Sequence, residues 1–218
     1  MSVAHFLTKV TFRKKLQKTY RDRFLKYGAT PTGSFWLSKI RQDKRLKLIL
    51  DQIMLQSPRT NFSIADIGCG YGALAAYLSN NTRFRHVEYT GYDISPELIT
   101  ASQQQLTNSQ FRFKVGTCPE HQTAFVVMSG TYNLAATQDL LAWEKYVFDC
   151  LKACWNKTTR AMIFNLQVAK TAHIAKDAIY YAECENIIKL CNAVFGPTGI
   201  IFDPSLPNDA TFTVRRPN

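Results

Sequence analysis

Residues 64–72 read Ile-Ala-Asp-Ile-Gly-Cys-Gly-Tyr-Gly, and this stretch decides the fold. After Asp66, glycine recurs at every second position, at Gly68, Gly70 and Gly72. Glycine has no side chain and accepts unusual backbone angles. A strand that ends in such a loop and leads into a helix therefore brings main-chain groups close to a nucleoside-bearing ligand. The stretch predicts a strand, a ligand-binding loop and a helix in succession.

A second acid follows at matched spacing, because Asp93, in Gly91-Tyr92-Asp93-Ile94-Ser95, lies 21 residues past Gly72 and ends a second apolar segment. Strand and helix patterns then alternate, which predicts a doubly wound, mostly parallel α/β sheet with helices on both faces. The last two strands have no helix between them, which predicts an antiparallel hairpin at the C-terminal edge. We expect strands at 63–67, 86–92, 111–115, 124–128, 161–166, 199–203 and 211–215, and helices at 73–79, 96–106, 139–155 and 176–195.

The chain of 218 residues is 46% hydrophobic and 20% charged, and its length suits one domain with its own core. No apolar run approaches the roughly 18 residues that would span a bilayer. The cysteines show no Cys-x-x-Cys pair and no zinc-type Cys/His spacing, so we expect no metal and reduced thiols in a cytoplasmic protein. A metal pair at Cys150 and Cys154 is the weaker alternative. The six are Cys69, Cys118, Cys150, Cys154, Cys184 and Cys191.

The excess positive charge lies in the N-terminal fifth of the chain. Residues 1–47 hold 13 Lys and Arg and two acids, which accounts for the whole net charge of +11. The other 171 residues hold 14 basic and 14 acidic residues. An enzyme that grips a long nucleic acid usually spreads basic charge around its active site. The distribution therefore predicts a basic arm on a neutral enzyme body.

The arm reads as a helix from about residue 5 to residue 26, because Phe12, Leu16, Tyr20 and Phe24 recur every four residues between basic ones. Two interpretations stay open. The helix could lie on an anionic partner, either a membrane surface or RNA phosphates. Alternatively, its aromatic stripe packs on the body and its basic face is solvated.

A loop at Gly28 to Gly33 and a second helix at 41–56 follow the arm. We accordingly divide the chain into a basic helical arm and lid, residues 1–57, and a ligand-binding domain, residues 58–218.

The two acid-bearing motifs at Asp66–Gly72 and Asp93, with this alternation, resemble the class I S-adenosylmethionine-dependent methyltransferases over roughly residues 60–215. Nicotinamide-binding folds carry Gly-x-Gly-x-x-Gly and normally lack the acid before the first glycine, so that class is disfavoured. The resemblance implies a Rossmann-like fold and S-adenosyl-L-methionine as the cofactor.

The resemblance also implies roles along the cofactor. The loop Gly68 to Gly72 passes under the methionine part, Asp66 engages its amino group directly or through water, and Asp93 accepts from the ribose hydroxyls. Ile94 flanks the adenine ring. The loop Gly116-Thr117-Cys118 lacks the Asp that many relatives place there for the adenine amino group, which leaves the backbone or the Thr117 hydroxyl. The residues expected on the cofactor side are Trp36, Arg45, Asp66, Gly68, Cys69, Gly70, Gly72, Asp93, Ile94, Thr117 and Ser129.

The acceptor is expected beyond the fourth strand, at Ser129-Gly130-Thr131-Tyr132-Asn133. This stretch only partly matches the Pro-Pro motif of nucleic-acid amino-methyltransferases, since both prolines are missing. Further features resemble a poorly characterised bacterial-type subgroup. They are Tyr27-Gly28-Ala29-Thr30-Pro31, Trp36, Arg45, Phe164-Asn165, Tyr180-Tyr181-Ala182 and Phe212-Thr213-Val214-Arg215. We expect Tyr132, Asn133, Asn165, Tyr180 and Tyr181 on the acceptor side.

Several alternatives stay open at these positions. Asn133 and Asn165 could instead cap their strands, and Trp36 could be a lid aromatic or a core residue. Arg45 could pair with a carboxylate of cofactor or substrate, or be a solvated helix residue. His121 and His173 have no partner acid at a fixed spacing, so we expect them at the surface.

The sequence therefore favours an enzyme that transfers a methyl group by in-line displacement to an O or N of a small-molecule or sugar-like acceptor. Positioning and desolvation can supply most of the rate, so a dedicated base is not required. Methylation of RNA or protein docked through the basic arm is one alternative. A non-catalytic cofactor-binding protein is another. Nothing in the sequence specifies an oligomeric state.

Overall fold

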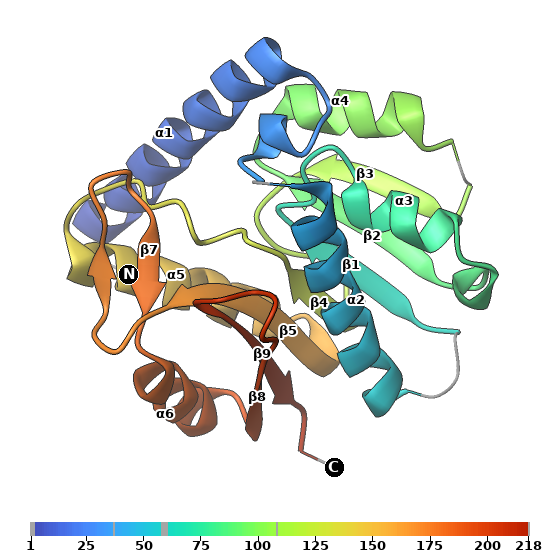
Figure 1. Cartoon of the computed structure of the whole chain (residues 1–218). Coiled ribbons are helices and arrows are strands. Elements are labelled where there is room, and N and C mark those ends of the chain that lie inside the picture. Colours follow the sequence, from blue (N-terminus) through green and yellow to red (C-terminus); the bar gives the residue numbers. More distant parts are fainter. Residues whose placement is uncertain (1–2, 37, 58–60, 108, 218) are drawn as a thin grey trace.

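The computed structural model describes residues 3–36, 38–57, 61–107 and 109–217. A mostly parallel sheet forms its centre, with helices on both faces (Figure 1). The helices are α1 Val3–Tyr27, α2 Lys39–Gln56, α3 Ala73–Ser79, α4 Pro96–Gln105, α5 Leu140–Trp155 and α6 Cys184–Val194, with short 3₁₀ turns η1 Thr32–Ser34 and η2 Thr82–Phe84. The strands are β1 Ser63–Ile67, β2 Glu88–Asp93, β3 Phe111–Val115, β4 Thr123–Met128, β5 Thr158–Val168, β6 His173–Ile174, β7 Tyr180–Ala182, β8 Thr198–Phe202 and β9 Asp209–Arg215.

The sheet has the order β3-β2-β1-β4-β5, with parallel pairing throughout this part. Beyond β5, β9 pairs antiparallel with β5 and β8 pairs antiparallel with β9. The expected antiparallel hairpin at the C-terminal edge is therefore confirmed. The order reverses between β1 and β4, and the carboxyl ends of these strands are where doubly wound sheets bind ligands.

Alternating side chains of the central strands divide the core into two layers. Ile64 and Val127 pack with the buried side of α2 and α3, through residues such as Ile49 and Leu74. Ala65, Val126 and Met162 face the other layer, which is formed by α1, α5 and α6. This period of two is what a strand buried on both faces requires.

The predicted helix at 176–195 is wrong over residues 176–183. Residues 173–182 form the hairpin β6–β7, and α6 begins only at Cys184. Ala178 has φ +65°, a left-handed conformation that interrupts a helix, and the Tyr180 amide donates to the Asn133 carbonyl at 2.8 Å. The segment thus pairs within the hairpin and with the loop after β4 instead of forming a helix. Strand β5 is also longer than predicted, since it must pair with β4, β9 and β7.

Helix α1 packs on the body by its apolar stripe. Phe12 and Leu16 are buried, and the Phe12 ring lies 6.1 Å from that of Trp143 and 5.7 Å from that of Tyr146. The Lys9 ammonium pairs with Asp149 of α5 at 3.1 Å. The interpretation of a helix packed by its aromatic stripe is therefore confirmed, although the outer face remains basic.

The predicted boundary between residues 1–57 and 58–218 falls beside residues 58–60, which lie outside the described ranges. Both α1 and α2 contribute to the cores of the sheet. None of the helices within the described ranges combines the length and the apolar character that crossing a bilayer requires.

Candidate functional site

A cavity of about 650 Å³ lies at the carboxyl ends of the central strands, beneath α1 and the loop before α2. In Figure 1, α1 crosses the upper edge of the molecule, and it contacts α4. Ten of the eleven residues predicted on the cofactor side line this cavity. They are Trp36, Arg45, Asp66, Gly68, Cys69, Gly70, Asp93, Ile94, Thr117 and Ser129.

Asp93 connects the two sequence motifs into one site. Its Oδ2 accepts from the Gly70 amide at 2.9 Å, and its Oδ1 accepts from the Ser95 amide at 2.9 Å. Burial raises the pKa of Asp93 to about 6, and the amide donors Ser95, Gly70 and Ile94 oppose that rise. The carboxylate thus fixes the glycine loop and still has lone pairs that face the cavity.

Asp66 is the more deeply buried acid, with 3% of its surface exposed. The Tyr89 hydroxyl donates to its Oδ2 at 2.7 Å. Burial raises the pKa of Asp66 to about 7; the bond from Tyr89 lowers it, and the nearby charge of Asp93 raises it. Tyr89 was not foreseen as its partner, because the two lie on neighbouring strands.

The glycines of the loop are needed for different reasons. A Cβ placed on Gly70 would lie 3.3 Å from Ser34 Oγ, so the loop after α1 packs on bare backbone there. Gly72 does not line the cavity. Its φ is +84°, and a Cβ would lie 2.6 Å from Leu106 Cδ1. Gly72 is therefore required by the turn and by packing on the chain after α4, not by a direct approach to the ligand.

Helix α1 and the loop that follows it form one wall of the cavity. Tyr20 of α1 lines the cavity, and burial together with the charge of Asp93 raises the pKa of its hydroxyl. Arg23 donates to the Thr32 carbonyl at 2.7 Å and lies over the Phe35 ring, 4.1 Å from its centroid. These contacts hold the loop against α1, so Ser34, Phe35 and Trp36 all reach the cavity.

Three of the five predicted acceptor-side residues line the cavity, namely Tyr132, Asn133 and Tyr181. Tyr132 is buried, and its hydroxyl has no hydrogen-bond partner among the described residues. Burial also raises the pKa of this hydroxyl well above its usual range, so it stays protonated as a donor.

Asn165 and Tyr180 lie outside the cavity lining. Asn165 Oδ1 accepts from the Gly130 amide at 2.6 Å, which ties the loop after β4 to β5. The Tyr180 hydroxyl donates to Glu144 at 3.0 Å. Asn133 also connects the loop after β4 to β5, because its Oδ1 accepts a hydrogen bond from the Gln167 amide at 3.0 Å. The strand-capping interpretation therefore holds for both asparagines, and Asn133 also faces the cavity.

Arg45 is neither solvated nor unpaired. Its Nη2 pairs with Asp209 Oδ2, and only 13% of its side chain is exposed. The guanidinium lies over Trp36, 4.8 Å from the ring centroid, which makes Trp36 a cavity aromatic rather than a core residue. Burial raises the pKa of Asp209 to about 6, and Arg45 opposes that rise.

The histidines lie away from the cavity. His121 and His173 are exposed, and the His173 ring stacks on Tyr181 with centroids 4.9 Å apart. The expectation of surface histidines is confirmed. All six cysteines are free thiols, and Cys150 of α5 lines the cavity.

Sequence reasoning missed several lining residues. Tyr20 belonged to a stripe that predicted burial but gave no sign of facing a ligand. Gln167 lies one residue past the predicted end of β5, and Ile179 lies in the hairpin β6–β7, which was predicted as helix. Asp209 could not be paired with Arg45 from the sequence, because the two are far apart along the chain.

Comparison with known proteins identifies the family of the chain. The model of the methyltransferase domain family matches residues 65–156, which include the glycine loop and Asp93. Rv1506c of Mycobacterium tuberculosis, which is named as a methyltransferase, is 30% identical over 132 residues, covering 60% of this chain and 78% of the relative. The chain therefore belongs to the class I S-adenosylmethionine-dependent methyltransferases, and its cofactor is S-adenosyl-L-methionine.

Solved structures share the fold at low identity. Magnesium protoporphyrin IX methyltransferase from Synechocystis PCC 6803, crystallised with the cofactor, superposes with a TM-score of 0.64 at 15% identity over 96% of this chain and 97% of that one. The amino pentose methyltransferase CalS10 from Micromonospora echinaspora gives 0.58 at 14% identity, over 80% and 91%. The predicted Rossmann-like fold is confirmed.

Proposed function

We propose that this methyltransferase transfers the methyl group to an oxygen or nitrogen of a small acceptor enclosed in the cavity beneath α1. The observation that carries the proposal is that one cavity includes both Asp93 of the cofactor side and Tyr132 and Tyr181 of the predicted acceptor side, with α1 residues in its wall. A long polymer would have to displace that helix. Two fold neighbours carry names of small-molecule methyltransferases, one for a porphyrin and one for an amino pentose.

The residues present fit the cofactor. Ser34 Oγ and Ser129 Oγ are buried and have no hydrogen-bond partner among the described residues, so both would be satisfied by a polar ligand. Gly68 and Gly70 leave the backbone bare at the same edge. Asp93 would accept the ribose hydroxyls with its remaining lone pairs, and such charge-assisted bonds are strong.

The other roles follow from position. Asp66 would hold the amino group of the methionine part, directly or through water. The Cys69 amide donates to the Tyr92 carbonyl and the Cys69 carbonyl accepts from the Gly72 amide, so Cys69 would line the site without a free amide. Ile94 and Thr117 would flank the adenine. When bound, the cofactor supplies a methyl group on a sulfonium, which is already a good leaving group. The protein then has to bind, orient and exclude water.

Isotope transfer tests the proposal against its alternatives. Tritiated methyl groups from the labelled cofactor should enter the small-molecule fraction of a lysate. Label in RNA or protein would reject the small acceptor and favour methylation of a macromolecule docked through the basic arm. Absence of label together with intact cofactor binding by calorimetry would favour a non-catalytic binding protein.

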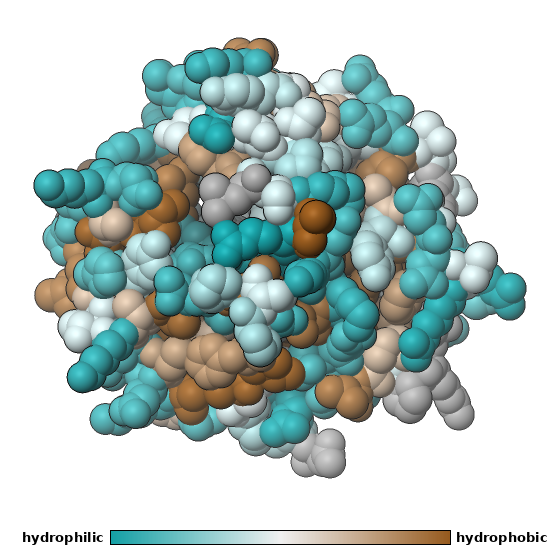
Figure 2. Space-filling model, viewed as in Figure 1, coloured by the Kyte–Doolittle hydropathy of each residue, from teal (hydrophilic) through white to brown (hydrophobic). Residues whose placement is uncertain are grey.

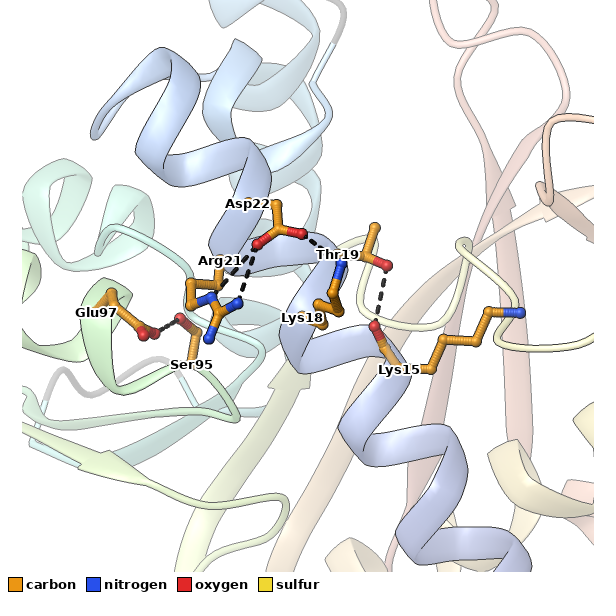
Figure 3. A network of polar contacts seen from close by, with 7 residues as sticks. All are labelled: Lys15, Lys18, Thr19, Arg21, Asp22, Ser95 and Glu97. Carbon is orange, nitrogen blue, oxygen red and sulfur yellow. Dashed lines mark hydrogen bonds and ion pairs between the residues drawn. The ribbon is translucent and has the colours of Figure 1, made fainter.

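Docking of an anionic macromolecule through α1 remains a second candidate because one face of the helix is basic and exposed. Figure 3 shows that Lys18 and Arg21 both engage Asp22, at 3.0 and 3.3 Å. Lys14 and Lys15 are exposed and have no ion pair with another described residue. Figure 2 shows hydrophilic and hydrophobic side chains interspersed on the viewed face.

Truncating the arm would not test this candidate, because Phe12 and Leu16 belong to the core. The double variant Lys14→Glu, Lys15→Glu leaves the packed stripe intact. Small-molecule methylation should survive it, whereas docking on RNA or an anionic membrane should weaken steeply with this charge reversal.

The free thiols are in keeping with a cytoplasmic location, which cell fractionation would check.

A further inference from the structure

A cluster of charged residues at the β4–β5 side of the cavity has no role in the cofactor contacts assigned above. Arg45 pairs with Asp209 Oδ2, and the same oxygen accepts from Gln167 Nε2 at 3.0 Å. Asp209 is buried, with 4% of its surface exposed. The acid is thus engaged from two sides and is held in place by β5 and α2.

The Arg45 guanidinium has a donor that the contact with Asp209 leaves unpaired. Arg45 Nε is buried and has no hydrogen-bond partner among the described residues. Arg45 Nη1 lies 3.6 Å from the position a Cβ on Gly130 would take, and Trp36 lies 3.5 Å from it. Gly130 follows β4, so the free donors of Arg45 and the Trp36 ring lie above the end of that strand. A buried, unsatisfied donor on a charged group is costly unless a ligand satisfies it.

The cluster also has an excess of positive charge. Arg41, one turn before Arg45 on α2, lines the same cavity, and its charge acts on both Arg45 and Asp209. Among the described residues Asp209 forms an ion pair with Arg45 and none with Arg41, so two guanidinium groups lie near one carboxylate. A planar anion would satisfy the remaining donors, since guanidinium and carboxylate match in geometry.

The described lining of the cavity includes no residue suited to act as a general base at the β4–β5 side. Asp66 and Asp93 lie at the ends of β1 and β2, on the cofactor side. Asp177 is exposed at the rim and accepts from the Ile179 amide at 3.3 Å. None of the described lining residues is a histidine, lysine or glutamate. An acceptor that is already deprotonated at neutral pH needs no base.

We infer that the acceptor is an organic acid, whose carboxylate is held by Arg45 and Arg41 beside Trp36 and is methylated on oxygen. This inference rests on the proposed function and names its acceptor class. One carboxylate oxygen forms the bond to the methyl carbon while the carbon–sulfur bond breaks and its electron pair stays on sulfur. A carboxylate and a sulfonium become a neutral ester and a neutral thioether, and no proton is exchanged. The ester then loses its charge-assisted bonds to the guanidinium groups, which favours its release.

Binding of acid probes tests the inference without turnover. The protein, saturated with S-adenosylhomocysteine, is titrated by calorimetry with naphthalene-2-carboxylate and hexanoate and with the methyl ester of each. We expect at least one acid to bind about tenfold or more tightly than its ester. Arg45→Gln and Arg41→Gln should each abolish most of that difference. Lys47→Gln, on the same helix but exposed and paired with Asp51, is the matched control and should change nothing.

Two results of this titration would overturn the inference. One is that neither acid binds more tightly than its ester. The other is that Arg45→Gln weakens binding of S-adenosylhomocysteine and leaves acid binding unchanged, which would assign the guanidinium to the cofactor. Unchanged affinity for S-adenosylhomocysteine in the Arg45 and Arg41 variants also shows that they are folded.

The isotope experiment separates this inference from the proposed function. Label transferred to a carboxylate is released by mild alkali as volatile methanol. Label that enters small molecules but resists alkali would leave the proposed function standing and reject the organic acid. Without any transferred label the proposed function itself fails, and the acid titration still decides whether the cluster binds carboxylates.

Discussion

Two buried carboxyl groups, those of Asp66 and Asp93, lie at the ends of neighbouring strands and dominate the electrostatics of the site. Burial raises the pKa of Asp66 to about 7 and that of Asp93 to about 6. Perturbed acids of this kind concentrate at functional sites, because binding a ligand requires groups that folding alone would not bury. We therefore expect the cofactor affinity to depend on pH near neutrality.

Asp93→Asn should weaken binding of S-adenosylhomocysteine by about 1.5 to 3 kcal/mol, through loss of charged hydrogen bonds. The affinity of the wild type should fall as the pH drops from 8 to 5, since protonation removes acceptors from Asp93. Calorimetry at several pH values measures both effects, and the dependence below about pH 6 should be smaller in the variant. Glu88→Gln is the control, because Glu88 is an exposed acid at the opposite end of β2. Equal affinity of wild type and Asp93→Asn at pH 8 would remove Asp93 from the site.

Asp66→Asn should stabilise the ligand-free protein and weaken its binding of cofactor. The folded-state pKa of Asp66 is raised above its ordinary value of 3.8, so the folded state binds a proton more readily than the unfolded state. Its contribution to stability is present at low pH and is lost as the pH rises through about 7. Asn removes the buried charge and can still accept from Tyr89.

Denaturation by urea checks this prediction, with an expected gain of about 1 to 3 kcal/mol at pH 8 and a smaller one at pH 5. A gain that is equal at both pH values would show that a cause other than ionisation is responsible. A loss at pH 8 would contradict the predicted sign.

Gly72→Ala should lower stability without altering the ligand contacts. The strained φ and the close approach to Leu106 together should cost about 1 to 3 kcal/mol. Thermal denaturation measures the loss, and calorimetry well below the transition should find nearly unchanged affinity. Gly199→Ala is the matched control, since a Cβ there meets nothing within 4 Å. A large loss of affinity in folded Gly72→Ala protein would place this glycine at the cofactor instead.

The sequence could predict those residues of the site that belong to local motifs. The Asp66–Gly72 run and Asp93 can be recognised from their residue types and their separation in the sequence. In the structure, Asp93 accepts a hydrogen bond from the Gly70 amide. The pair Arg45–Asp209 carries no such signal, because it forms only when β9 is inserted beside β5 and α2 covers the sheet. Contacts between distant segments need the whole topology before they can be foreseen.

Among the elements, prediction succeeded where apolar periodicity is strong. Strands β1 to β4 and helices α2 to α5 lie within about two residues of their expected ends. The hairpin β6–β7 was read as helix because its two strands are short and their partners lie elsewhere. Strand β7 pairs with the end of β5 through Tyr181 and Ala182. Tertiary pairing overrides local preference in such short segments.

Helix α1 is the element for which the sequence-based prediction and the structure differ most. The sequence predicts a basic arm, whereas in the structure the helix forms a wall of the cavity. Phe12→Ala should destabilise the protein by about 3 kcal/mol or more, because the ring is buried against Trp143 and Tyr146. Urea denaturation measures the loss. Phe202→Ala, at a ring that is 57% exposed, is the control and should have little effect. A detachable arm would instead leave stability unchanged in Phe12→Ala.

At the scale of the molecule, one cavity is lined by residues from both of the layers that pack on the central sheet. The layer with α2 supplies Arg45, and the layer with α1 and α5 supplies Tyr20 and Cys150. The ends of the central strands supply the carboxylates between them. We therefore expect ligand binding to stabilise elements that lie far apart in the sequence, which a site confined to the glycine loop would not do.

S-adenosylhomocysteine should accordingly protect α1 as well as the glycine loop. At a concentration 100 times its Kd it should add about 2.7 kcal/mol of stability, or roughly 5 to 10 °C in Tm for a chain of this length. Hydrogen exchange should slow at residues 68–72 and also at residues 16–24 of α1, because Tyr20 lies near Asp93 and lines the same cavity. Asp93→Ala should lose about half or more of both protections at the same ligand concentration, while Lys47→Gln should keep them. Protection of residues 68–72 alone would mean that α1 opens independently of the bound ligand, and α1 would then not act as a lid.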